Sequence, residues 1–161
     1  MKSLNKEHLQ ILTCFLNKKV DFLLLGGHAA IFYGVRRTTS DIDILVRPTF
    51  ENGERILSAF QELKLLVDDI SPQDFEKNIV LSFGEEPNAV DLINYMVGVD
   101  IEKVFNNARI VNYDGFKVKM IDVYDLLANK ESLNRTGEKG FSDQLDILVL
   151  KKIIAENREA K

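Results

Sequence analysis

The sequence contains few of the residues that mark several classes of protein. Its 161 residues include one cysteine and three prolines. A single cysteine, Cys14, excludes an internal disulfide, and without a Cys/His cluster we expect no structural zinc ion. No apolar run approaches the roughly 18 residues of a membrane span, and no charged and then apolar leader opens the chain. These absences predict a cytoplasmic protein that does not associate with a membrane.

Positive charge is not in excess either. The chain carries 21 basic and 25 acidic residues, for a net charge of −4. That balance argues against a protein that wraps nucleic acid by bulk positive charge. The length fits one domain, and no linker rich in glycine and serine divides it. We predict a single domain over residues 1–161, with a core at about 20–120 and a helical C-terminal part at about 121–161.

Apolar residues alternate between helical and strand spacing along the chain. Helices are predicted at 3–19, with Ser3 as the N-cap, and at 28–33, 50–65, 100–107, 122–133 and 142–157. Strands are predicted at 22–25, 41–46, 79–83, 89–93, 109–112 and 116–120, the last two as a hairpin. The polar residues between the last two helices, 134–141, predict a loop. Because hairpins are mixed with alternating helices and strands, the pattern favours an α/β (α+β) fold with one mixed sheet flanked by helices.

Two acidic residues stand in a predicted strand, where aspartate is disfavoured. In Asp41-Ile42-Asp43-Ile44, the isoleucines face the core and the two aspartates project together from the other face, about 7 Å apart along the backbone. Neighbouring carboxylates repel one another unless a cation lies between them, and their oxygens suit Mg²⁺ or Mn²⁺. The alternative is a pair of solvated aspartates on an exposed strand face.

A third aspartate repeats this pattern. In Val90-Asp91-Leu92, the apolar side chains share one face and Asp91 lies on the other. If the two strands are neighbours, Asp91 joins Asp41 and Asp43 in a three-carboxylate site, which can hold two metal ions roughly 4 Å apart for nucleotidyl displacement. The alternative is that Asp91 caps a strand or pairs with a lysine.

Two glycines end the first strand. Gly26-Gly27 leads into a helix, so backbone N–H groups and close approach can form an anion site for phosphates. The alternative is a tight turn from strand to helix. Elsewhere, we expect Cys14 to be a small buried side chain among apolar neighbours, and His8 to lie on the polar part of the first helix.

Together these features resemble the nucleotidyltransferase superfamily of the DNA polymerase β type, in which Gly-Gly is followed by thirteen residues and Asp-apolar-Asp. A finer pattern is similar to the minimal bacterial nucleotidyltransferases of the abortive-infection, AbiEii-like branch; it comprises Gly26-Gly27-x-Ala29, Arg37-x-Thr39-x-Asp41-Ile42-Asp43, Val90-Asp91-Leu92-Ile93, and then Lys130, Arg135, Asp143 and Asp146. The segment between Arg135 and Asp143 is longer than in that branch, so Lys139 has no assigned role.

The resemblance implies a role for each matching residue. Asp41, Asp43 and Asp91 would be catalytic and would hold two Mg²⁺ or Mn²⁺ ions, with Asp91 placed to take the proton of the acceptor hydroxyl. Substrate contacts are implied for Gly26, Gly27, His28, Arg37, Thr39 and Lys130.

Several of these assignments have alternatives. His28 either donates to a phosphate or is a structural histidine at the helix start. Arg37 either pairs with phosphate or clamps Asp41. Lys130 is either a triphosphate contact or a helix-surface lysine. We expect Asp143 and Asp146 to favour the start of the last helix or to pair with Arg135 rather than to bind metal.

The implied function is transfer of a nucleoside monophosphate from an NTP to a hydroxyl of RNA (such as tRNA), protein or a small molecule. By family analogy the chain could be the toxin of a toxin–antitoxin module, with an antitoxin protein as partner. One alternative is a non-catalytic nucleotide-binding or interaction module of the same fold, although the presence of all three acids counts against it. Another is a two-metal phosphohydrolase.

Overall fold

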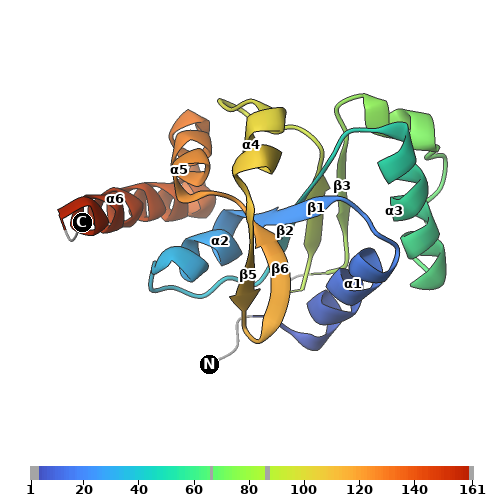
Figure 1. The fold of residues 1–161 in the computed structure, drawn as a ribbon, viewed down its shortest axis with the longest axis horizontal. Coiled ribbons are helices and arrows are strands. Elements are labelled where there is room, and N and C mark those ends of the chain that lie inside the picture. Colours follow the sequence, from blue (N-terminus) through green and yellow to red (C-terminus); the bar gives the residue numbers. More distant parts are fainter. Residues whose placement is uncertain (1–3, 66, 86–87, 160–161) are drawn as a thin grey trace. The chain divides into compact units, whose positions relative to one another are not determined.

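The computed structural model describes residues 4–65, 67–85 and 88–159 (Figure 1). The chain divides into two compact units. The first unit comprises Met1–Leu23 and Ser40–Tyr95, and the second comprises Leu24–Thr39 and Met96–Lys161. The strand β1 (Phe22–Leu25) contributes two residues to each unit, and all four of its residues are buried. Its continuous apolar run is typical of a strand covered on both faces.

The first unit is built on the strands β2 (Ile42–Val46), β3 (Val80–Phe83) and β4 (Val90–Ile93), together with its half of β1. β2 pairs with β4 in parallel, and β3 pairs with β4 antiparallel. Its helices are α1 (Lys6–Asn17), α3 (Phe50–Glu62) and the 3-10 turn η1 (Pro72–Glu76). The ring of Phe15 from α1 packs against Phe22 of β1 and Phe60 of α3, at centroid distances of 5.5 and 6.2 Å. These aromatic side chains fix α1 and α3 against β1.

The second unit joins β1 to the hairpin of β5 (Arg109–Tyr113) and β6 (Phe116–Met120). β1 and β6 are parallel, with Leu24 opposite Met120. Its helices are α2 (Gly26–Tyr33), α4 (Ile101–Asn107), α5 (Val123–Ser132) and α6 (Gly137–Glu159). α5 and α6 pack on one another and both contact α2. This packing brings side chains of the last two helices close to the segment that follows α2.

The strand order is β3-β4-β2-β1-β6-β5, and parallel and antiparallel pairs occur together. The predicted mixed sheet flanked by helices is therefore confirmed. Every predicted strand is present within a residue or two, and the β5–β6 hairpin turns at Asp114-Gly115 as expected. In the part of the chain that the structure describes, no helix is both long enough and apolar enough to cross a membrane.

Some predicted helix ends are wrong. α1 is capped by Asn5, whose side chain accepts a hydrogen bond from the His8 backbone N–H at 2.8 Å; the predicted cap, Ser3, lies outside the described residues. α2 begins at Gly26, two residues earlier than expected, because Gly26 adopts a backbone φ of +65° and turns the chain directly into the helix.

The largest error concerns α6. This helix starts at Gly137, so most of the predicted loop at 134–141 is helical. The two glycines that indicated a loop have other roles. Gly137 has a φ of +70°, and Gly140 lies so near the carbonyl oxygen of Arg135 that a Cβ atom there would be 2.4 Å from it. The short turn η1 was not expected at all.

Candidate functional site

Two of the three predicted catalytic aspartates face one another across β2 and β4. The parallel register pairs Ile42 with Val90, Asp43 with Asp91 and Ile44 with Leu92. The apolar partners are buried, whereas Asp43 and Asp91 are each half-buried. Residues paired in register on adjacent strands point to the same face, so the two carboxylates share one face of the sheet. The adjacency of these two strands, on which the inclusion of Asp91 depended, is confirmed.

The orientation of Asp91 is set by a neighbouring strand. Ser82 lies opposite Asp91 on β3, and its hydroxyl donates a hydrogen bond of 2.6 Å to Oδ1 of Asp91. This contact engages one carboxylate oxygen. A hydrogen bond of this kind helps to hold the plane of the carboxylate in a fixed orientation.

Asp41 lies outside the strand, in the bend that precedes β2. The strand ladder begins at the next residue, where the N–H of Ile42 donates to the carbonyl of Ala89 at 3.0 Å. The alternation that places Asp43 beside Asp91 therefore does not by itself fix the direction of the Asp41 side chain.

The register fits a divalent cation between Asp43 and Asp91, because carboxylate oxygens are the donors that Mg²⁺ and Mn²⁺ prefer. Across the described ranges, no three His, Cys, Asp or Glu side chains are gathered closely enough to hold a metal ion as they stand. The arrangement of three carboxylates and two metal ions stays a prediction. The backbone register supports the pairing of Asp43 with Asp91.

The start of α2 is tightly packed within the second unit. A Cβ atom on Gly27 would lie 2.6 Å from Oγ1 of Thr39 and 2.9 Å from Nη2 of Arg37. Any side chain at position 27 would therefore force Thr39 and Arg37 to shift. Gly26, Gly27, Arg37 and Thr39, which were all predicted as substrate contacts, are brought together at this helix start.

His28 occupies a structural position. Its side chain is 1% exposed, and Nδ1 is 2.9 Å from the hydroxyl of Tyr113 on β5. The two rings also pack edge to face, with centroids 5.7 Å apart. Of the two roles open for His28, the structural one matches these contacts.

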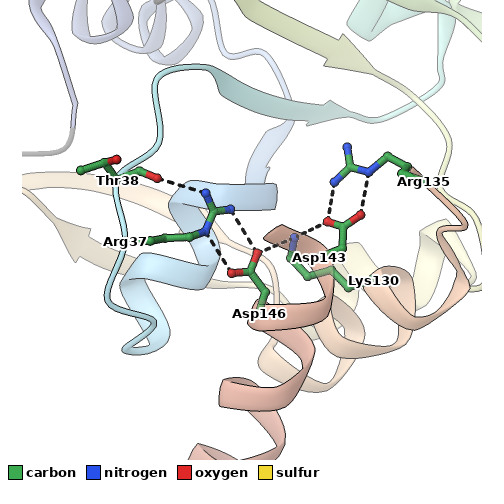
Figure 2. Close-up of polar contacts among 6 residues, drawn as sticks. All are labelled: Arg37, Thr38, Lys130, Arg135, Asp143 and Asp146. Atoms are coloured by element: carbon green, nitrogen blue, oxygen red, sulfur yellow. Dashed lines mark hydrogen bonds and ion pairs between the residues drawn. The ribbon is translucent and has the colours of Figure 1, made fainter. Parts of the chain in front are cut away.

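A cluster of five charged residues joins the segment after α2 to α5 and α6 (Figure 2). Arg37 makes two hydrogen bonds to Asp146, from Nε to Oδ1 at 2.9 Å and from Nη2 to Oδ2 at 3.1 Å. Lys130 lies between the two carboxylates, 3.2 Å from Asp143 and 2.9 Å from Asp146. Nε of Arg135 donates to Asp143 at 2.7 Å, and its Nη2 makes a second, short contact with the same carboxylate.

This charged cluster corrects three predictions. Arg37 pairs with Asp146, which neither of its predicted roles included. Lys130 is not a helix-surface lysine, because its side chain is 3% exposed and pairs with both aspartates; its contact with a triphosphate stays a prediction. Asp143 and Asp146 lie well inside α6 rather than in its first turn, so they do not cap the helix; the predicted pairing of Asp143 with Arg135 is confirmed.

Two effects on the pKa of Asp143 oppose each other. Burial alone would raise it, because the charged form loses solvation. The hydrogen bonds and positive charges of Arg135 and Lys130 outweigh burial, so the pKa of Asp143 lies below its ordinary value of 3.8. The carboxylate is therefore ionised at neutral pH and holds the two cations in place.

His8 and Cys14 lie on the buried side of α1. The prediction for His8 is wrong: its side chain is 1% exposed, and Nε2 is 3.3 Å from the carbonyl oxygen of Asn88. Burial lowers its pKa, so the ring is neutral at pH 7. No local signal could have shown this, because the partner is 80 residues away in sequence.

Cys14 is buried as expected. Its thiol donates to a carboxylate oxygen of Glu62 at 2.9 Å. Burial and this neighbouring carboxylate raise the pKa of the thiol to about 11. A thiol of this kind is not a nucleophile at neutral pH, in agreement with the packing role predicted for it.

Comparison with known proteins bears on the fold. No protein-family model and no curated protein matches the chain. Among solved structures, the lincosamide antibiotic adenylyltransferase LnuA, solved with lincomycin bound, aligns with a TM-score of 0.58 over 95% of this chain and 99% of its own. The chain shares its fold with this adenylyltransferase. At 17% sequence identity the likeness concerns the fold alone. The nucleotidyltransferase superfamily and its AbiEii-like branch stay predictions.

Proposed function

We propose that this chain is a metal-dependent nucleotidyltransferase that moves a nucleoside monophosphate from an NTP to a hydroxyl group of a small molecule. The observation that carries the proposal is the in-register pair of half-buried carboxylates, Asp43 and Asp91, on adjacent strands of a fold shared with an adenylyltransferase. Two aspartates at directly opposed strand positions repel one another, and a divalent cation bound between them would offset that repulsion.

Asp43 and Asp91 would hold the divalent cation, with Asp41 as a third carboxylate from the adjoining bend. The ion would supply positive charge that stabilises the triphosphate and the developing negative charge of the transition state. Ser82 would contribute by holding the Asp91 carboxylate through the hydrogen bond to Oδ1.

The reaction forms one bond and breaks another. The acceptor oxygen attacks the α-phosphorus of the NTP, the bond from that phosphorus to the bridging oxygen breaks, and pyrophosphate leaves. Asp91 would accept the proton that the acceptor hydroxyl loses. No covalent intermediate with the protein is required, so catalysis consists of positioning and charge stabilisation.

The triphosphate would bind at the start of α2. The backbone N–H groups of Gly26 and Gly27 would donate to phosphate oxygens, as at other helix N-termini that bind anions. Thr39 packs against Gly27 and would add a hydroxyl to this group. Arg37 and Lys130 would support it indirectly, through their ion pairs with Asp146.

A small-molecule acceptor is favoured over RNA by two observations. The net charge of −4 offers no bulk attraction to a polyanion. The adenylyltransferase that shares the fold is described as acting on a lincosamide antibiotic. The toxin–antitoxin assignment, with a protein or tRNA acceptor and an antitoxin partner, has no support beyond the resemblance in sequence.

Labelled nucleotides test the proposal. Each NTP, labelled in the α-phosphate in one series and in the γ-phosphate in another, would be incubated with Mg²⁺, the wild-type protein and a panel of hydroxyl-bearing small molecules. Transfer predicts that α-label enters the acceptor while γ-label appears in pyrophosphate. The variant Asp43→Asn should give neither product, and Glu54→Gln, which neutralises an exposed carboxylate on α3, should behave as wild type.

Other outcomes would contradict transfer. Release of γ-label as inorganic phosphate, without α-label in any acceptor, would identify a phosphohydrolase. Metal-dependent NTP binding without turnover, against small-molecule, RNA and protein acceptors alike, would identify the non-catalytic binding module.

A further inference from the structure

Three polar residues connect the start of α1 to the start of β4. Asn88 lies two residues before the start of β4, and its side-chain oxygen accepts a hydrogen bond from Nδ2 of Asn5 at 2.7 Å. Its carbonyl oxygen lies 3.3 Å from Nε2 of His8. Asn5 and His8 are themselves joined, because the Asn5 side chain also caps α1 at the His8 N–H. We call Asn5, His8 and Asn88 the Asn88 cluster.

Asn88 lies three residues before Asp91, on the segment that leads into β4. The next residue, Ala89, accepts a hydrogen bond from the N–H of Ile42, the residue between Asp41 and Asp43. From this point the parallel register runs on to Asp43 opposite Asp91. A slip of one residue would send Asp91 to the opposite face of the sheet, since side chains alternate along a strand.

We infer that the Asn88 cluster positions Asp91 against Asp43, and that Asn5 and His8 are positioning residues for the proposed metal site. β4 is four residues long and pairs with β2 on one side and with β3 on the other. The side chains of Asn5 and His8 add contacts just before β4, at the end where Asp91 lies. Because α1 is held by Phe15 against β1 and α3, these contacts tie Asn88 to a helix with a fixed position.

The chemistry of the contacts specifies which variants keep them. A carbonyl oxygen can only accept, so Nε2 of His8 carries the proton and donates to Asn88. Glutamine places an N–H donor at nearly the same distance from the backbone, so His8→Gln should retain the contact. His8→Met fills similar space without a donor. Asn5→Ser retains an acceptor for the α1 cap but has no amide to reach Asn88.

Disulfide trapping measures this geometry directly. Paired residues on adjacent strands have Cα atoms about 4.8 Å apart, within the range of about 4.4–6.8 Å that a disulfide spans. The variant Asp43→Cys with Asp91→Cys, made with Cys14→Ala so that no other thiol is present, should form the crosslink under mild oxidation. Adding His8→Met or Asn5→Ser should slow crosslinking about tenfold, since displacements of about 1 Å have effects of that order or more.

Two controls separate positioning from loss of stability. His8→Gln should crosslink at nearly the parent rate. Ile11→Val removes one methyl group from a buried residue of α1 and so lowers stability; it should leave crosslinking unchanged. A second readout uses the protein that keeps Asp43 and Asp91. Its affinity for Mn²⁺, followed by electron paramagnetic resonance, should fall about 10- to 100-fold in His8→Met, the range typical of residues that orient metal ligands.

The inference rests on the proposed function, because that function assigns metal binding to Asp43 and Asp91. The crosslink tests only their geometry and requires neither metal nor nucleotide. Crosslinking that is equally fast with His8→Met and Asn5→Ser would overturn it, as would failure of the parent to crosslink. Absence of nucleotidyl transfer in the wild type would instead overturn the proposed function, whatever the crosslinking result.

Discussion

Lys130 is a buried lysine on α5, and its side chain is 3% exposed. It shares two aspartates with two arginines, so three positive charges face two negative ones in the charged cluster. Removing the lysine would leave Asp143 with Arg135 and Asp146 with Arg37 only. We predict that Lys130→Met lowers the free energy of unfolding by about 3 kcal/mol, the lower end of the range for breaking a buried ion pair, because each carboxylate keeps one partner.

Urea unfolding of the two proteins tests this prediction. The matched control is Lys151→Met, since Lys151 pairs with Glu131 between the same two helices but at an exposed position, with 56% of its side chain accessible. An exposed pair is worth about 0–1 kcal/mol, so the control should be close to wild type. Equal losses in the two variants would contradict a special role for burial at Lys130.

Asp143 predicts a pH dependence of stability. Its pKa is lower in the folded protein than in the unfolded chain, so its contribution is fully present above the unfolded value of about 3.9 and is lost as the pH falls through the lower, folded value. The difference in unfolding free energy between wild type and Asp143→Asn should therefore be largest near neutral pH and shrink below about pH 4. Unfolding in urea at several pH values measures it, with the exposed Asp68→Asn as the reference. A difference that grows on acidification would contradict the assignment.

The same residues show what could be predicted at this scale. Asp43 and Asp91 could be recognised because strand alternation is local and their apolar neighbours mark the buried face. Lys130, Arg37 and His8 could not be placed, because their partners lie on elements distant in sequence and the side chains carry no local sign of being buried.

At the scale of elements, the start of α6 depends on a glycine. Helix propensity alone predicts that alanine at position 140 would stabilise a helix by roughly 0.5–1 kcal/mol. The structure predicts the opposite, because the added Cβ would lie 2.4 Å from the carbonyl oxygen of Arg135, a backbone atom that cannot rotate away. Gly140→Ala should lower the free energy of unfolding by about 1–3 kcal/mol, the usual cost of overpacking.

Thermal or urea unfolding checks the prediction for Gly140. Lys139→Ala, one residue earlier on the same turn and exposed, should change stability by less than about 0.5 kcal/mol. Stabilisation by Gly140→Ala would show that the helix starts later, as the sequence alone suggests.

Helix and strand cores were predictable in this chain, and their ends were less so. The apolar spacing that defines a helix or strand is repeated over many residues, whereas an end is decided by one or two. At α6, glycine was interpreted as a loop residue because its tolerance of positive φ and of close contact cannot be distinguished in sequence from flexibility. The cap of α1 was predicted at Ser3 and is found at Asn5 for a similar reason, since either residue type can cap a helix.

At the scale of the whole molecule, charge limits the partners. With a net charge of −4, the protein should show no salt-dependent, non-specific affinity for RNA. We predict no binding of bulk tRNA at micromolar protein concentration and about 50 mM salt, as measured by filter retention or fluorescence anisotropy. Binding that weakens steeply with added salt would contradict this expectation and would favour an RNA acceptor.

The central claim is that Asp43 and Asp91 hold the cation for nucleotidyl transfer, and one measurement tests it most directly. It is the rate at which label passes from α-labelled NTP to acceptor in Asp43→Asn, Asp91→Asn and Glu54→Gln, each compared with wild type in Mg²⁺. Loss of a direct ligand should cost at least about 100-fold, because removing a residue that only orients a ligand already costs 10- to 100-fold. Both aspartate variants should fall by that factor while Glu54→Gln stays at the wild-type rate; transfer that persists in either aspartate variant within about tenfold of wild type would contradict the claim.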